Sequence, residues 1–164
     1  MSWVPTAAPD SPTFEGWLAN RPELLTLYRR FYATPWDDAL LPPRLLELCR
    51  LRTAQLHECE AELAVRDPAL VDDATLAGLA LWERAEGFSE VERAALAIAE
   101  KMPWAHHAIT DGEYAALRRH LDEPAVVALT VALALFDANC RLRLVFEFAP
   151  SPSTAAPAAA GPLH

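Results

Sequence analysis

Helix start signals recur along this chain, whereas no segment alternates apolar and polar residues over the length that a strand requires. Asn20 and Asp122 each precede an early proline, and Ser89 and Thr110 each stand three residues before a glutamate. Both patterns are typical of helix N-termini. The sequence therefore predicts an all-α protein with six or seven helices.

The distribution of proline predicts the domain organisation. Prolines concentrate at both ends of the 164 residues, and the helical apolar periodicity lies between them. We expect a flexible N-terminal arm at 1–13, one helical domain at 14–149 and a disordered Pro/Ala-rich tail at 150–164.

Two of the expected helices are long, and the later of these, from Asp122 towards Phe146, is the last long helix. The first begins at the proline pair 42–43 and continues until Pro68, with Cys59 on the same apolar face as Leu45 and Cys49. Another helix is expected to begin after a capping aspartate, either Asp72 or Asp73, and to reach about Arg84.

Composition argues against several function classes. The net charge of −9 repels nucleic acids and anionic membranes, and the longest uncharged apolar run, 124–136, is shorter than the roughly 20 residues of a membrane span. The chain begins without a secretory signal, so we expect a cytoplasmic protein with reduced cysteines. Without a glycine-rich phosphate loop, no nucleotide cofactor is expected.

Residues 125–138 are apolar on nearly every side of the helix that they are expected to form. A helix of this kind is enclosed on all faces. Either it is the central helix of the core, or a second copy of the chain covers part of it, and the sequence leaves both interpretations open.

Two stretches carry a family pattern, namely 41–66 and 88–141, the second including Thr110-Asp-Gly-Glu-Tyr and the run from Leu129 to Arg141. In this order, over about residues 40–145, they resemble the carboxymuconolactone decarboxylase and alkylhydroperoxidase D superfamily. The resemblance implies an all-helical subunit that forms a homo-oligomer. In peroxidase members it also implies a Cys-x-x-Cys-x-x-x-His motif that reduces hydroperoxides, with an upstream glutamate as proton relay.

The candidate site residues follow from this resemblance. Glu47 stands at the relay glutamate and Cys59 at the first cysteine of the motif, whereas Glu62 replaces the second cysteine and Arg66 the histidine. Glu62 cannot form a disulfide. The resemblance therefore implies a degenerate site that keeps one motif sulfur.

The other cysteines offer no evident second sulfur. Cys49 lies about 15 Å from Cys59 on a continuous helix, beyond the roughly 7 Å limit between Cα atoms of a disulfide. Cys140 can approach only from another helix, which the sequence does not place. We also expect Glu58, Glu60 and Glu62 to raise the pKa of Cys59. Two-cysteine peroxidase activity is thus not expected.

On a continuous helix, the four candidate residues and Gln55 share one sector about 120° wide. Glu62 and Arg66 would then form an i, i+4 ion pair. Two interpretations stay open: a polar cluster that binds a small acid, or a solvated ion pair with Cys59 as a small core residue.

Other candidate sites are weaker. The zinc-protease pattern that begins at His57 has Ala61 in place of its second histidine, so no metal is expected there. His106 and His107 are expected to lie in a loop rather than bind a metal ion. Arg141 is expected to pair with an acid on another helix.

Three functions therefore remain open. The first is a peroxidase-like oxidoreductase that uses Cys59, with Glu47 as proton relay and an external thiol as reductant. The second is an acid–base enzyme acting on a small carboxylic acid or lactone, in which Glu47 and Glu62 move protons and Arg66 holds a carboxylate. The third is a catalytically silent binding or scaffold oligomer.

Overall fold

The computed structural model describes residues 6, 13–36 and 40–148. Within these ranges the chain forms eight α-helices and three short 3-10 helices (η) and no strand, so the all-α prediction is confirmed. The elements are α1 (Phe14–Leu18), α2 (Pro22–Ala33), η1 (Thr34–Trp36), α3 (Pro43–Leu56), α4 (Glu60–Leu63), α5 (Asp73–Gly78), η2 (Leu79–Leu81), α6 (Glu90–Lys101), η3 (His106–Ala108), α7 (Asp111–Leu117) and α8 (Glu123–Val145). Apart from Thr6 and Thr13, the expected arm and tail lie outside the described residues.

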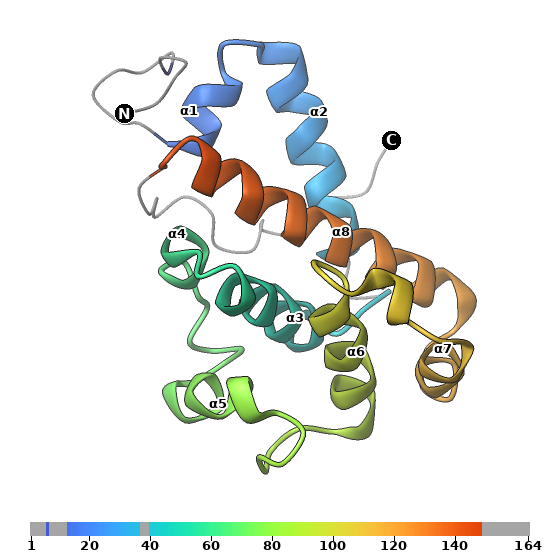
Figure 1. The fold of residues 1–164 in the computed structure, drawn as a ribbon. Helices are drawn as coiled ribbons and strands as arrows, with labels where there is room; N and C mark the ends of the chain where they lie inside the picture. Colours follow the sequence, from blue (N-terminus) through green and yellow to red (C-terminus); the bar gives the residue numbers. More distant parts are fainter. Residues whose placement is uncertain (1–5, 7–12, 37–39, 149–164) are drawn as a thin grey trace.

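Helix α3 lies at the centre of the fold. Its residues from Leu45 to Ala54 are all buried, which requires neighbours on every side of the helix. α6 and α8 pack against it, and Figure 1 shows α8 crossing the molecule between the α1–α2 pair and the helices α3 and α6. The charged residues in the middle of α3 are therefore enclosed by the core.

Local capping chemistry sets most helix starts where the sequence predicts them. The Asp122 side chain accepts a hydrogen bond from the Ala125 N–H at 2.9 Å, and Glu92 and Glu113 complete capping boxes with Ser89 and Thr110. α2 differs slightly, because it begins at Pro22 without a side-chain cap.

The continuous helix expected up to Pro68 is wrong. α3 ends at Leu56, and Glu58 adopts a positive φ of 53°, which an α-helix does not accommodate. Cys59 then caps the short helix α4. The helix expected to reach Arg84 is also shorter, because α5 ends at Gly78 and continues only as η2.

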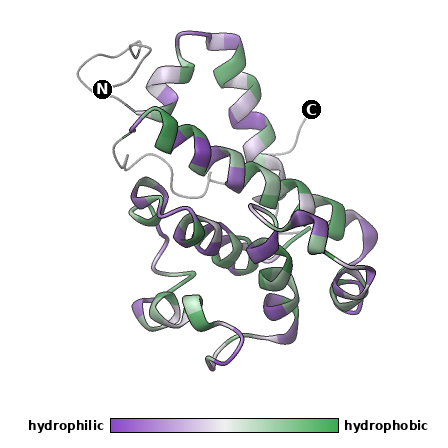
Figure 2. Cartoon of the chain, viewed as in Figure 1, coloured by the Kyte–Doolittle hydropathy of each residue, from purple (hydrophilic) through white to green (hydrophobic). Residues whose placement is uncertain are grey.

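Helix α8 buries one face and exposes another. Leu129 and Phe136 lie in the main core, whereas Val127 is 61% exposed. By length and composition alone, α8 is long and apolar enough to cross a membrane, and the core helices of soluble proteins pass the same test. It carries the buried polar residues Asn139 and Arg143 near its C-terminal end, where Figure 2 shows purple bands. Their burial against the rest of the chain identifies α8 as a core helix.

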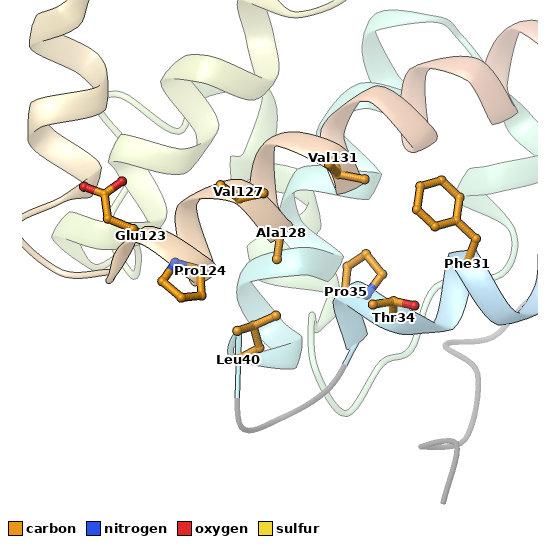
Figure 3. Close-up of a pocket in the computed structure, with 9 residues that line it drawn as sticks. All are labelled: Phe31, Thr34, Pro35, Leu40, Glu123, Pro124, Val127, Ala128 and Val131. Atoms are coloured by element: carbon orange, nitrogen blue, oxygen red, sulfur yellow. The ribbon is translucent and has the colours of Figure 1, made fainter. Parts of the chain in front are cut away.

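An apolar groove of about 570 Å³ lies between the α2–η1 segment and the first turns of α8. Phe31 and Pro35 line one side, and Val127 and Val131 line the other (Figure 3). Phe31 is 53% exposed, and Leu24 and Leu27, which also belong to α2, are exposed as well. The groove therefore leaves an apolar surface uncovered in a single chain.

The homo-oligomer stays a prediction, and the groove provides its test. Light scattering at micromolar concentration is expected to give a multiple of the 18.1 kDa chain mass. Val127→Asp places a charge in the groove and should lower that mass, whereas Leu81→Asp alters a residue that is 68% exposed on η2 and should not. A monomeric wild-type protein would contradict the prediction.

Candidate active site

The turn between α3 and α4 holds Cys59 in the interior. The Cys59 N–H donates to the carbonyl of Ala54 at 2.9 Å, and the Cys59 carbonyl accepts the Glu62 N–H at 3.0 Å. Cys59 is only 1% exposed. The thiol is thus fixed by a turn, not carried on the side of a long helix.

Arg50 forms the centre of a buried ion cluster. Its Nε and Nη2 donate to the two carboxylate oxygens of Glu47 at 2.8 and 2.7 Å. Its Nη1 donates to both the carboxylate and the carbonyl of Glu62, at 2.7 and 2.8 Å. The three side chains are at most 4% exposed. One guanidinium therefore ties α3 to α4.

Arg143 joins the cluster from α8. Its Nε lies 2.5 Å from the second carboxylate oxygen of Glu62, and its guanidinium stacks over the ring of Phe14 at 5.0 Å. Its Nη1 has no hydrogen-bond partner among the described residues. The cluster contains two carboxylates and two guanidiniums, so it is electrically neutral, as buried charges must be to avoid a large desolvation cost.

Two tyrosines of α2 lie in the electrostatic field of the cluster. Burial, together with the nearby Glu62 carboxylate, raises the pKa of both Tyr28 and Tyr32. The Tyr28 hydroxyl is also hydrogen-bonded to the side chain of Asn139. The phenols therefore stay neutral and add polar groups, but no charge, beside Glu62.

The side chain of Cys140 on α8 is hydrogen-bonded to that of Cys59. This bond and the Glu62 N–H lower the pKa of Cys59 to about 7, although burial and the Glu62 carboxylate oppose them. The expectation that neighbouring glutamates raise the pKa of Cys59 is therefore wrong in its net direction. The hydrogen bond to Cys59, followed by burial, raises the pKa of Cys140. Cys59 therefore loses its proton more readily than Cys140 does.

A histidine–aspartate contact beside the thiols was not found from the sequence. His57 Nε2 lies 2.7 Å from Asp137 Oδ1, and the His57 ring packs against Trp104, with 4.8 Å between ring centroids. Arg141 also pairs with Asp137, at 3.0 Å, which corrects the expectation of an acid on another helix. Only the fold brings residue 57 next to α8, so no sequence spacing signals this contact.

Arg66 does not pair with Glu62. It donates to the carbonyl of Val71 and lies 2.5 Å from a carboxylate oxygen of Asp73, which is 93% exposed. The break at Glu58 removes the helical register that would have aligned Arg66 with Glu62. Arg50 and Arg143 take the place expected for Arg66, and the structure thus brings together Glu47, Glu62 and Cys59 without it.

The metal candidates gain no support. His106 and His107 are exposed and form the first two residues of the short 3-10 helix η3. In the described part of the chain, no three His, Cys, Asp or Glu side chains are arranged to hold a metal ion.

Several solved structures share this arrangement of helices. A protein of unknown function from Agrobacterium tumefaciens, with a suggested role in antioxidant defence, matches with a TM-score of 0.71 and 18% identity over 82% of this chain and 95% of its own. The alkylhydroperoxidase D core of a peroxidase-related protein from Ralstonia eutropha matches with a TM-score of 0.65 and 20% identity over 82% of this chain and 74% of its own. The chain has the alkylhydroperoxidase D fold.

This fold does not by itself decide the chemistry. A cysteine-to-alanine variant of the debrominase Bmp8, solved in complex with 2,3,4-tribromopyrrole, matches with a TM-score of 0.69 and 15% identity over 84% of this chain and 75% of its own. No protein-family model and no curated protein matches the sequence. The alkylhydroperoxidase D fold predicted from the resemblance is confirmed, and the activity has to be argued from the site.

The buried cluster predicts how the protein responds to loss of each arginine. Arg50→Met should destabilise it by about 3–5 kcal/mol, because two buried carboxylates lose their shared partner. Arg66→Met removes a pair with an exposed aspartate and should cost about 1 kcal/mol. Denaturant unfolding of both variants, each with and without Glu62→Gln, measures the coupling. A stronger coupling of Glu62 to Arg66 than to Arg50 would contradict this assignment.

Proposed function

We propose that this chain is a peroxidase-like thiol oxidoreductase in which a small hydroperoxide oxidises Cys59. The environment of Cys59 is the observation that carries the proposal. Hydrogen bonds from Cys140 and from the Glu62 N–H lower the pKa of Cys59 to about 7, so a large fraction of this thiol is ionised at neutral pH. The thiolate is the nucleophilic form of cysteine.

The proposed reaction balances without any metal or organic cofactor. The Cys59 sulfur attacks the terminal oxygen of the hydroperoxide, and the O–O bond breaks. The sulfur becomes a sulfenic acid, and the former thiol proton ends on the alcohol or water that leaves. An external thiol supplies the electrons that later restore Cys59.

The carboxylates fit a positioning role better than an acid–base role. Both oxygens of Glu47 accept hydrogen bonds from Arg50, and Glu47 also accepts the Asp67 N–H at 3.1 Å. The two oxygens of Glu62 face Arg50 and Arg143. Neither carboxylate has an oxygen free of a guanidinium, so the geometry does not favour proton transfer by Glu47 or the decarboxylase-like alternative.

Burial limits the size of the oxidant. Because Cys59 is 1% exposed, a substrate reaches it only when the 57–60 turn or a helix beside it moves. Such an opening admits hydrogen peroxide more readily than a bulky organic hydroperoxide. We therefore propose small hydroperoxides as the substrate class and, as the sequence predicts, a reducing cytoplasmic setting.

The proposal is tested by the pH dependence of Cys59 oxidation. Stopped-flow measurement of hydrogen peroxide consumption by the reduced protein should give a rate constant that rises with pH and is half-maximal near pH 7, because only the thiolate reacts. Cumene hydroperoxide should react more slowly than hydrogen peroxide.

Two cysteine variants provide the controls. Cys59→Ala should abolish the reaction. Cys49→Ala should leave it unchanged, because Cys49 lies in the main core and burial raises its pKa. Peroxide consumption that survives in Cys59→Ala would refute the proposal. A rate that is half-maximal near the pKa of an ordinary cysteine thiol would also refute it.

A further inference from the structure

Cys59 and Cys140 come from distant parts of the sequence and meet in the interior. Their side chains are hydrogen-bonded to each other, and they share a small buried cluster with Ala54 and Ala61. Each cysteine is 1% exposed. Contact between the two side chains is the first requirement for a disulfide, whose Cα atoms lie within roughly 7 Å of each other.

A second contact holds the same two segments together. Asp137 lies three residues before Cys140, on the same side of α8. It binds His57, two residues before Cys59, at 2.7 Å. The 57–59 turn is therefore attached to α8 at two neighbouring points, which keeps the sulfur atoms facing each other.

The third cysteine is not a competing partner. Cys49 lies in the main core, in a different cluster from the other two thiols. Glu62, which stands at the motif position of a second cysteine, is bound to Arg50 and Arg143. Cys140 is thus the thiol placed to react with Cys59.

We propose that Cys140 is the resolving thiol of this site, so that the chain is a two-cysteine peroxidase whose second sulfur comes from α8. The proposal rests on the proposed function, and it replaces the sequence-based expectation that two-cysteine chemistry is absent. It also assigns a catalytic role to a residue outside the motif.

The resolving step is chemically balanced. After the hydroperoxide has converted Cys59 to a sulfenic acid, the Cys140 sulfur attacks the Cys59 sulfur and the S–O bond breaks. The Cys140 proton leaves with the hydroxyl group as water, and a Cys59–Cys140 disulfide remains. An external dithiol then reduces this disulfide and is itself oxidised to a disulfide.

The charge state of the pair favours this order of events. While Cys59 is a thiolate, the hydrogen bond to it raises the pKa of Cys140 and keeps Cys140 protonated. Oxidation of Cys59 removes that negative charge and releases the bond. One cause of the raised pKa of Cys140 is thereby lost at the point when its sulfur is required to attack.

Peptide mass spectrometry of the full-length protein tests the proposal. The reduced protein is treated with an equimolar amount of hydrogen peroxide in the presence of dimedone, which traps sulfenic acids. It is then alkylated and digested without reduction. The wild type should lose the thiols of Cys59 and Cys140 together and yield the peptide that links them. Cys49→Ala should behave in the same way, and the linked chain should run as a monomer on a non-reducing denaturing gel.

The variant Cys140→Ala separates this proposal from the proposed function. It should still react with peroxide, but Cys59 should appear as the dimedone adduct, and turnover with dithiothreitol as reductant should be lost. If wild-type Cys59 is oxidised while the Cys140 thiol stays intact, the resolving role is overturned and the proposed function stands. If Cys59 is oxidised in neither protein, both are overturned.

Discussion

The candidate site depends on the hydrogen bonds that the buried guanidinium of Arg50 makes. This guanidinium binds Glu47 within α3 and both the carboxylate and the carbonyl of Glu62 in α4, so it fixes the chain on either side of the Cys59 turn. Arg143 then connects Glu62 to α8. Each charge in this buried cluster is compensated by another, and removal of one partner would leave an unpaired charge in the core.

Local signals predicted much of the fold. Ser89, Thr110 and Asp122 begin helices where the sequence places them, because their side chains satisfy N–H groups within a few residues. The break at Glu58 has no such signal. The residues around it suit a helix, and the positive φ is held instead by contacts with distant groups, among them Arg50 with Glu62 and His57 with Asp137. Helix propensity gives way to tertiary packing at this point.

The sequence identified several residues of the candidate site but not the contacts between them. The resemblance identified Glu47, Cys59 and Glu62, and in the structure Arg50 joins Glu47 to Glu62. Cys140 was visible in the sequence as a third thiol, but its role depends on the path of α8 across the α3–α4 turn. Arg66 was assigned through the same resemblance, at the position of the motif histidine, and its pairing with Glu62 was expected because a continuous helix was assumed. The motif keeps one sulfur, and the fold places the side chain of Cys140 beside it.

Hydrogen–deuterium exchange of the Cys59–Leu63 amides in Arg50→Met, compared with the wild type, tests most directly whether the buried guanidinium holds this turn. Our account predicts slow exchange of the Cys59, Glu62 and Leu63 amides in the wild type, because these three are hydrogen-bonded to the backbone carbonyls of Ala54 and Cys59. In the variant their exchange should accelerate far more than that of the amides of α6, a helix that contributes no side chain to the ion pairs of the cluster. Equal acceleration in both segments, or none in the turn, would contradict the central role of Arg50.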